Sequence, residues 1–180
     1  MVPFPALPLA PSDRTRLISL ALSAREGSYS PYSKFRVGAC LLTDGGEFVQ
    51  GCNVECASYG GAICAERTAV VKAVSTGTRK FVALAVTSDV DGMVSPCGIC
   101  RQVLREFCPL EMPVLLIPAS YEEGKTPVKN AAEAEGNETS GVVVETTMGE
   151  LLPLSFGPSD LEKPRTGPNA GAVAGAEAAA

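Results

Sequence analysis

Three cysteines and one glutamate stand at spacings that suit a catalytic zinc site. Cys64 and Glu66 are two residues apart, and Cys97 and Cys100 follow as a Cys-x-x-Cys pair directly after Pro96. Zinc accepts thiolate ligands, and a catalytic zinc site keeps three protein ligands and leaves one position for water. The chain contains no histidine, so a carboxylate has to move the protons that such chemistry requires. Glu66 is the candidate for that role.

Local structure favours the same three thiolates. The two sulfurs of the Cys-x-x-Cys pair share one face at the expected start of a helix, and Cys64 lies near the start of another. If the two helix N-termini converge, their positive dipole ends stabilise the thiolates. Three thiolates leave a net charge of about −1 on a zinc site. Arg67 and Arg101 are placed to offset that charge, and we expect Arg67 to lie beside a zinc-bound sulfur.

Two other interpretations of these cysteines are open at this point. Structural zinc sites are closed by a fourth protein ligand, which here would be Cys52, Cys56 or a carboxylate. A redox Cys-x-x-Cys pair is the second alternative, but it leaves the Cys-Ala-Glu segment at 64–66 without a role. The spacing of all four residues favours the catalytic zinc site.

Composition and charge limit the class of protein. The 180 residues are 46% hydrophobic and 19% charged, which indicates one soluble globular domain. The net charge of −5 argues against binding a nucleic-acid polymer. The seven cysteines are an odd number, which does not suggest a disulfide framework. The N-terminus lacks the pattern of a signal peptide or membrane span, so we expect a cytoplasmic protein with reduced thiols.

Hydrophobic periodicity and turn residues predict an α/β fold. We expect Ser12 to cap the first helix, Asp44-Gly45-Gly46 to form a hairpin turn, and Thr147 with Glu150 to open a short helix as a capping box. The order of elements predicts a mixed sheet covered by helices. The expected long helices are 13–25, 63–75 and 96–107, and the expected strands are 34–42, 47–54, 81–87, 114–117 and 142–146.

Three segments differ in composition from the rest. Residues 1–11 are proline-rich and predict a flexible N-terminal arm, while residues 163–180 are rich in alanine and glycine and predict a disordered tail. Residues 119–141 are long and polar, which is typical of a flexible insertion. The remaining chain, 12–162, forms a single catalytic domain in this interpretation.

A Cys-x-Glu segment followed by Pro-Cys-x-x-Cys is typical of zinc-dependent nucleobase deaminases. From about residue 12 to 160, apart from the 119–141 insertion, the chain resembles the cytidine deaminase family, the small nucleoside enzymes of pyrimidine salvage. The resemblance implies a three-layer α/β/α fold with a five-stranded mixed sheet, one Zn²⁺ per subunit, and a homotetramer with sites shared between subunits. Further motifs that carry it are Ser-Pro-Tyr-Ser-Lys-Phe-Arg-Val-Gly-Ala at 30–39, Gly-Cys-Asn-Val-Glu at 51–55 and Leu-Leu-Pro-Leu-Ser-Phe-Gly-Pro at 151–158.

The resemblance also assigns substrate contacts. It implies that ribose hydroxyls, the nucleoside face and the base are held within one subunit, and that two aromatic side chains come from a neighbouring subunit, one of them stacking on the ring. A carboxylate at the sugar accepts from a hydroxyl but repels a phosphate, which favours a free nucleoside. Ordinary packing would explain the aromatic residues equally well without the resemblance. The implied contacts within one subunit are Asn53 and Glu55 with the ribose, Phe35 with the nucleoside, and the Ala65 backbone with the base. The two residues implied from the neighbouring subunit are Phe156, which stacks on the ring, and Tyr59.

The resulting hypothesis is a hydrolase that deaminates cytidine and deoxycytidine to uridine and deoxyuridine and releases ammonia. A related deaminase acting on an aminonucleoside antibiotic such as blasticidin S, or on deoxycytidylate, is an alternative. The Asn53-x-Glu55 pair with Phe35 favours a plain nucleoside, and we find no basic cluster for a phosphate. A non-catalytic zinc-stabilised binding module is the alternative from a different class.

Overall fold

A computed structural model describes residues 9–134 and 139–166. Most of the expected arm (residues 1–8), four residues of the expected insertion (135–138) and most of the expected tail (167–180) lie outside the described residues. Within the described part of the chain, no helix has the length and apolar character to cross a bilayer.

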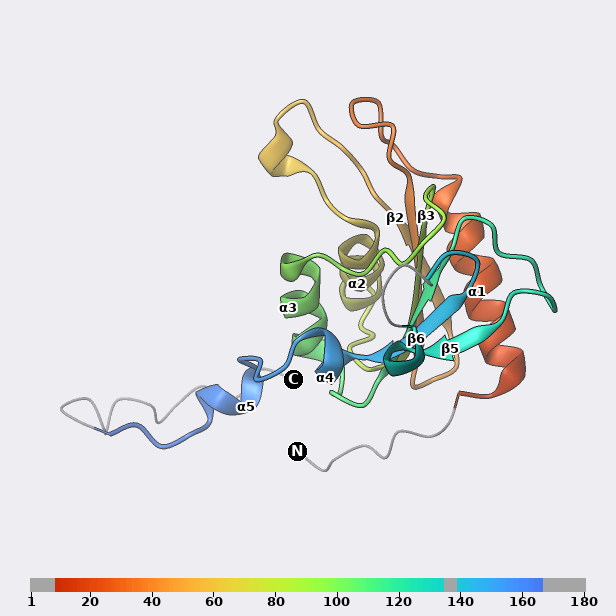
Figure 1. The fold of residues 1–180 in the computed structure, drawn as a ribbon. Coiled ribbons are helices and arrows are strands. Elements are labelled where there is room, and N and C mark those ends of the chain that lie inside the picture. Colours follow the sequence, from red (N-terminus) through yellow and green to blue (C-terminus); the bar gives the residue numbers. More distant parts are fainter. Residues whose placement is uncertain (1–8, 135–138, 167–180) are drawn as a thin grey trace.

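A mixed sheet forms the centre of the fold (Figure 1). Its strand order is β2-β1-β3-β4-β6-β5. The β3–β4 and β5–β6 pairs are parallel and the other pairs are antiparallel. The mixed sheet is therefore confirmed, with six strands rather than the expected five. The strands are β1 (Val37–Thr43), β2 (Phe48–Cys52), β3 (Phe81–Ser88), β4 (Pro113–Ile117), β5 (Val128–Asn130) and β6 (Val143–Thr147).

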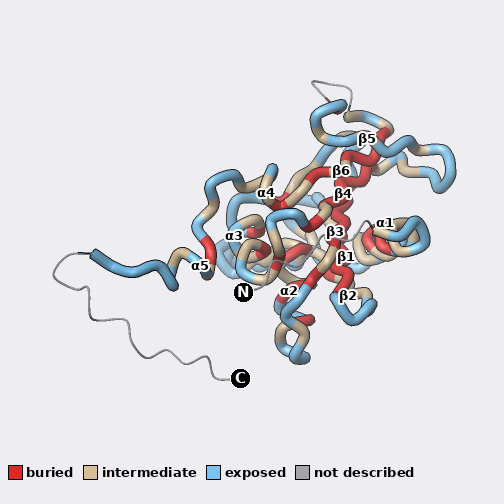
Figure 2. The backbone as a smooth tube through the Cα atoms, turned by 90° about the horizontal axis from the view of Figure 1, so that it is seen from below, coloured by how far each residue is buried: buried red, intermediate tan, exposed pale blue. Residues whose placement is uncertain are grey.

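Helices cover both faces of this sheet, as Figure 2 shows from below, with the sheet seen edge-on. Helix α1 (Pro11–Arg25) lies on one face, and α2 (Ala65–Ser75), α3 (Gly98–Phe107) and α4 (Met148–Leu151) lie on the other. A short helix α5 (Pro158–Leu161) and two 3₁₀ turns, η1 (Tyr59–Gly61) and η2 (Ala131–Glu133), complete the described elements. The expected three-layer α/β/α arrangement is confirmed.

Alternation along the central strands explains the three layers. Successive side chains of a strand point to opposite faces, and here each face has its own core. Leu41, Leu84 and Leu116 pack with residues of α2 and α3, whereas Leu42, Ala85 and Leu115 pack with α1. The central strands are consequently buried on both sides, which is why residues 81–87 are almost continuously apolar.

The first helix starts differently from the expectation. Ser12 does not cap it, because the helix begins two residues earlier than expected, with Pro11 at its first position and Ala10 as the N-cap. Proline fits the first helical position because its φ angle is preset and its missing N–H would have no intrahelical partner there. By contrast, the expected capping box is confirmed: Thr147 accepts from the Glu150 amide, and Glu150 accepts from the Thr147 amide at 2.9 Å.

The sixth strand comes from within the expected insertion. Residues of β5 pair in parallel with β6, as in the Val128 and Val143 pair. The Asn130–Glu133 capping box follows directly and starts η2. Ser120 and Ser140, near the two ends of the 119–141 segment, both donate to the Asp91 carboxylate in the β3–α3 loop. The segment thus adds an edge strand to the sheet; its expected mobility stays a prediction.

Close approach of α2 to β2 depends on a glycine. A Cβ atom at Gly51 would overlap the Ala65 carbonyl oxygen and lie 2.5 Å from the Ala69 nitrogen. We therefore expect Gly51→Ala to lower the free energy of unfolding by about 1–3 kcal/mol, since the added methyl group overpacks the strand–helix contact. Urea titration measures this change. Gly60→Ala is the control, because a Cβ there would meet nothing within 4 Å; equal effects in the two variants would contradict the explanation.

Candidate metal centre and active site

The sulfur atoms of Cys64, Cys97 and Cys100 lie together, all within 4.8 Å of one another. The Sγ atoms of Cys64 and Cys97 are 3.9 Å apart, and those of Cys97 and Cys100 are 3.5 Å apart. Two sulfurs bound at 2.3 Å to a tetrahedral zinc ion are separated by about 3.8 Å. The cluster therefore fits zinc in both donor type and spacing.

Two helix N-termini bring these sulfurs together. Cys64 is the N-cap of α2, and Cys97 is the N-cap of α3, with Cys100 in the first turn of that helix. Both helices begin two residues later than expected from the sequence. As a result, Cys64 and Cys97 stand at the positive end of a helix dipole, where negative charge is stabilised.

Among residues 9–134 and 139–166, the metal-binding group comprises only these three side chains. The two cysteines considered as a fourth ligand have other surroundings. The Cys52 thiol donates to the Gly27 carbonyl at 3.1 Å, and Cys56 is exposed. A closed site with four cysteines is therefore absent from the described chain, which argues against a structural zinc site.

Arg67 supplies positive charge to the cluster. Its Nη2 atom lies 3.8 Å from the Cys64 sulfur, and its Nε is buried without a hydrogen-bond partner. A hydrogen bond from Cys100, with further ones from Arg67 and Cys97, lowers the pKa of the Cys64 thiol, while the same contact to Cys64, together with burial, raises the pKa of Cys100. In the metal-free cluster negative charge is thus favoured at Cys64 over Cys100, and a cysteine that binds the metal as thiolate has to release its proton.

Arg101, the other arginine considered for charge compensation, has a different position. Its guanidinium donates to the carbonyl oxygens of Pro96 and Leu151 and to the Ser95 hydroxyl. These contacts fix the segment that enters α3. Arg101 therefore supports the backbone around the cysteine pair, and Arg67 is the arginine that contacts a sulfur.

Glu66 lies in the first turn of α2, next to the cluster, and the residue is only 4% exposed. Burial raises the pKa of the Glu66 carboxyl, and the negative charge at Cys64 adds to this effect. A carboxyl group of this kind can both accept and return a proton near neutral pH. The preceding residue, Ala65, is fully buried at the start of the same helix.

The residues assigned to ribose hold a loop of the protein. The Asn53 side chain accepts from the Val37 amide and donates to the Phe35 carbonyl, both at 2.8 Å. The Glu55 carboxylate accepts from the Tyr32 amide at 2.9 Å and from the amide and hydroxyl of Ser33. Sequence reasoning missed Ser33, because its partner Glu55 is 22 residues away and no local pattern indicates the contact.

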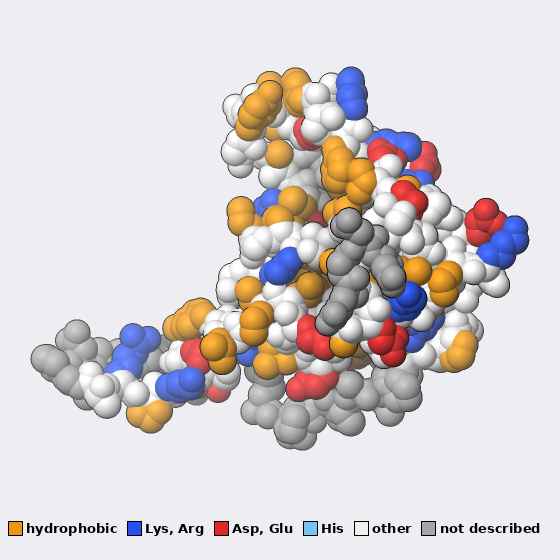
Figure 3. All heavy atoms as spheres, in the orientation of Figure 1, with side chains coloured by type: hydrophobic (Ala, Val, Ile, Leu, Met, Phe, Trp, Pro, Cys, Tyr) orange, Lys and Arg blue, Asp and Glu red, His pale blue; other side chains and the backbone are white. Residues whose placement is uncertain are grey.

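The aromatic candidates are exposed to different degrees. Phe35 is 38% exposed, just before β1. Tyr59, on η1, is 77% exposed, and its ring centroid lies 5.9 Å from that of Tyr32. Phe156 is 58% exposed and lies between α4 and α5, where its carbonyl accepts from the Gln102 side chain at 3.0 Å. Figure 3 shows hydrophobic side chains on the upper loops and along the segment that carries α5. Such exposed aromatic side chains are available for contacts with other molecules.

Comparisons with known proteins agree with this site. The family described as "Cytidine and deoxycytidylate deaminase zinc-binding region" matches residues 11–116. A cytidine deaminase from Sporosarcina psychrophila is 46% identical over 149 residues, which cover 83% of this chain and 95% of the relative.

A crystal structure of cytidine deaminase from Burkholderia pseudomallei has a TM-score of 0.66 at 40% identity and covers 79% of this chain and 98% of that one. A blasticidin-S deaminase from Bacillus cereus is less similar, at 29% identity over 132 residues, 69% of this chain and 79% of the relative. The zinc-compatible cysteine cluster, the α/β/α fold and these similarities together show that the chain belongs to the cytidine and deoxycytidylate deaminase family.

Proposed function

We propose that the protein is a zinc-dependent hydrolase that converts cytidine and deoxycytidine to uridine and deoxyuridine and releases ammonia. The observation that carries this proposal is the group of three cysteine sulfurs at two helix N-termini with the buried Glu66 beside them. Three protein ligands leave a position for water and substrate. The similarity to cytidine deaminases over most of the chain supports the same substrate class.

In this mechanism the protein supplies the proton transfers. Zinc held by Cys64, Cys97 and Cys100 would lower the pKa of water toward neutral and so supply the nucleophile. Glu66 accepts a proton from the attacking water and delivers it to ring N3, which makes C4 electrophilic. After the water oxygen has added to C4, Glu66 carries the remaining proton of that hydroxyl to the amino group. The C4–N bond then breaks, ammonia leaves, and the oxygen stays as the C4 carbonyl. One carboxyl group thus acts first as base and then as acid.

Ribose recognition by Asn53 and Glu55 is compatible with their contacts in the protein. A carboxylate offers about four acceptor positions, and three of those on Glu55 are occupied by the Tyr32 amide and the two Ser33 donors. One position remains for a sugar hydroxyl. Asn53 likewise has one amide hydrogen left beyond the one donated to Phe35. We propose that these two groups bind ribose, that Phe35 packs on the nucleoside, and that the Ala65 backbone contacts the base.

The exposed aromatic side chains support a shared site. We propose a homotetramer in which Phe156, stacking on the ring, and Tyr59 reach the site of a neighbouring subunit. Their exposure of 58% and 77% supports this proposal. We propose further that each subunit holds one Zn²⁺, that the enzyme acts in the cytoplasm, and that its role is pyrimidine salvage. Mass measurement by size-exclusion chromatography with light scattering tests the subunit count.

A substrate panel followed by ultraviolet absorbance tests the activity. We expect turnover of cytidine and deoxycytidine, with loss of turnover after treatment with a chelator and recovery after zinc is added. Cytosine and deoxycytidylate serve as comparisons that lack the sugar or carry a phosphate. A zinc-loaded protein that released no ammonia from any member of the panel would indicate a non-catalytic zinc-stabilised module instead.

Blasticidin S is the informative competitor in that panel. The lower similarity to a blasticidin-S deaminase makes this alternative weaker than cytidine. We expect kcat/KM for cytidine to exceed that for blasticidin S. The reverse order would transfer the proposal to an aminonucleoside deaminase with the same metal site.

The contact between Arg67 and the Cys64 sulfur predicts an effect on metal affinity. We expect Arg67→Gln to weaken zinc binding by roughly 10–100-fold, because groups that support metal ligands contribute on this scale. Competition with a chromophoric chelator measures the affinity. Arg79→Gln is the matched control, since Arg79 is exposed just before β3. Unchanged affinity in Arg67→Gln would remove this arginine from the metal site.

A further inference from the structure

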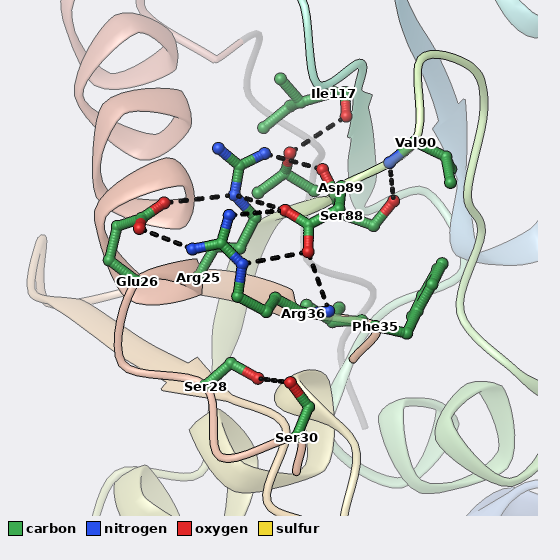
Figure 4. A network of polar contacts seen from close by, with 12 residues as sticks. Arg25, Glu26, Ser28, Ser30, Phe35, Arg36, Ser88, Asp89, Val90 and Ile117 are labelled. Carbon is green, nitrogen blue, oxygen red and sulfur yellow. Dashed lines mark hydrogen bonds and ion pairs between the residues drawn. The ribbon is translucent and has the colours of Figure 1, made fainter. Parts of the chain in front are cut away.

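A network of four charged side chains joins three segments of the chain (Figure 4). Arg25 and Glu26 lie at the end of α1, Arg36 directly precedes β1, and Asp89 directly follows β3. Asp89 accepts two hydrogen bonds from the Arg36 guanidinium, at 3.0 and 2.9 Å. Glu26 accepts from the same guanidinium at 2.7 Å, and Arg25 Nε lies 3.8 Å from Asp89 Oδ1.

Two contacts in this network are to the main chain. Arg25 Nη1 donates to the Ser88 carbonyl at 2.7 Å. The Asp89 carboxylate also accepts from the Arg36 backbone amide, at 3.1 Å. The β1–β3 ladder ends at the Val37 and Ser88 pair. The Asp89 side chain therefore provides an acceptor one residue beyond the last ladder pair and extends the anchoring of β1 as far as residue 36. Glu26 contacts Arg36 only through its side chain.

Phe35 is the residue that this anchoring places. Its own amide donates to the Ser33 hydroxyl at 3.0 Å, and its carbonyl accepts from Asn53 at 2.8 Å. With the Arg36 amide held by Asp89, the polar backbone groups on both sides of Phe35 have fixed partners. Figure 4 shows the Phe35 ring pointing away from the ion pairs, so its direction depends on the backbone at 35 and 36.

The exposure of the network argues that its main effect is on geometry. The side chains of Arg36 and Asp89 are 40% and 29% exposed, and ion pairs near the surface contribute little to stability. A bidentate pair between arginine and a carboxylate still fixes relative orientation strongly. Removal of Asp89 should thus change where Phe35 lies more than whether the protein folds.

We propose that Asp89 is a positioning residue that sets the Phe35 ring against the nucleoside by holding the Arg36 main chain and guanidinium. This inference rests on the proposed function, because the contact between Phe35 and the nucleoside is part of that proposal. Asp89 itself does not take part in the chemical step. It acts on substrate binding, so its loss affects KM and leaves the turnover of bound substrate largely intact.

The test compares Asp89→Asn with wild-type protein, both loaded with zinc. We expect KM for cytidine to rise about tenfold, which corresponds to the loss of a hydrogen bond to a charged acceptor. We expect kcat to stay within about twofold, because the proton-transfer groups are unchanged. Hydrogen exchange gives a second readout that is independent of catalysis: the Arg36 amide should exchange faster in the variant.

Glu26→Gln is the matched control. It removes a carboxylate that contacts the same guanidinium but no backbone amide, so KM and Arg36 exchange should remain at wild-type values. An equal rise of KM in both variants would overturn the inference, as would an unchanged KM in Asp89→Asn. If Asp89→Asn does not fold, Asp89→Glu replaces it: the charge is kept but displaced by one methylene group, KM should still rise, and a wild-type KM overturns the inference.

The two proposals fail differently in this experiment. Wild-type protein that does not deaminate cytidine overturns the proposed function and this inference with it. Active wild-type protein with a folded, zinc-loaded Asp89 variant of unchanged KM overturns the inference alone.

Discussion

Glu66→Gln is expected to lower kcat for cytidine deamination by about 10²–10⁴-fold, the usual contribution of a general acid–base group. The amide keeps the shape of the side chain but takes no proton from the attacking water and returns none to ring N3 or the leaving amine. The metal site should be unaffected, because the three cysteine sulfurs form the cluster without this carboxylate. Steady-state kinetics and zinc analysis of the same sample measure both quantities.

Stability gives an independent check on the same substitution. Burial raises the pKa of the Glu66 carboxyl in the metal-free protein. A carboxyl whose pKa is raised on folding favours the folded state at low pH, and this contribution is lost as pH rises and the group ionises. A neutral Gln at position 66 does not ionise. At neutral pH we therefore expect metal-free Glu66→Gln to melt at a temperature equal to or above that of the metal-free wild type.

Glu106→Gln is the matched control for both measurements, because Glu106 is an exposed glutamate on α3. It should retain wild-type kcat, zinc content and melting temperature. A Glu66→Gln variant that holds zinc and turns over at a nearly normal rate would exclude Glu66 as the proton carrier. Loss of zinc in that variant would place the carboxylate in the metal site instead.

Elements with strong local patterns could be predicted from the sequence. The apolar run at 81–87 indicated a central strand, and the structure shows why, since helices cover both faces of β3. The Thr147–Glu150 capping box was equally readable, because all of its hydrogen bonds lie within four residues. For α2 and α3, the starts expected from the sequence are two residues too early, because Cys64 and Cys97 occupy the N-cap positions and the helices begin after them.

Elements that depend on distant partners could not be predicted. The residues of β5, Val128–Asn130, include only one apolar side chain, and that side chain is exposed. Their strand conformation comes from backbone pairing with β6, which follows 13 residues later (143 − 130). A polar segment of this kind gives no alternating pattern for a sequence-based assignment to detect.

The candidate site likewise combines local features, which the sequence shows, with contacts between distant residues, which it does not. The spacing of Cys97 and Cys100 and the position of Cys64 are local features, and they indicate the cluster from the sequence alone. By contrast, Asn53 and Glu55 hold the 32–37 segment through contacts between residues far apart in the sequence. The contact between Arg36 and Asp89 likewise joins residues 53 positions apart. Nothing in the residue types distinguishes a side chain that holds substrate from one that holds the loop around it.

Cys97→Ala is expected to weaken zinc binding by more than about 100-fold, because loss of a ligand exceeds the 10–100-fold effect of losing a group that only supports one. Deamination should be lost with the metal. Cys97 suits this test better than Cys100, since Cys97 is exposed and Cys100 is buried. Replacing the exposed thiol removes a ligand without leaving a cavity in the core, so metal loss is separated from a packing defect.

Cys56→Ala provides the matched control, because Cys56 is an exposed thiol outside the metal-binding group. It should bind one zinc per chain with wild-type affinity and remain active. Metal analysis after dialysis, together with chelator competition, measures both variants. If Cys97→Ala kept its full zinc content, Cys97 would not be a ligand, and a site built from Cys64 and Cys100 would have to find its third donor elsewhere. If Cys56→Ala lost zinc to the same extent, the ligand set at the two helix N-termini would be wrong.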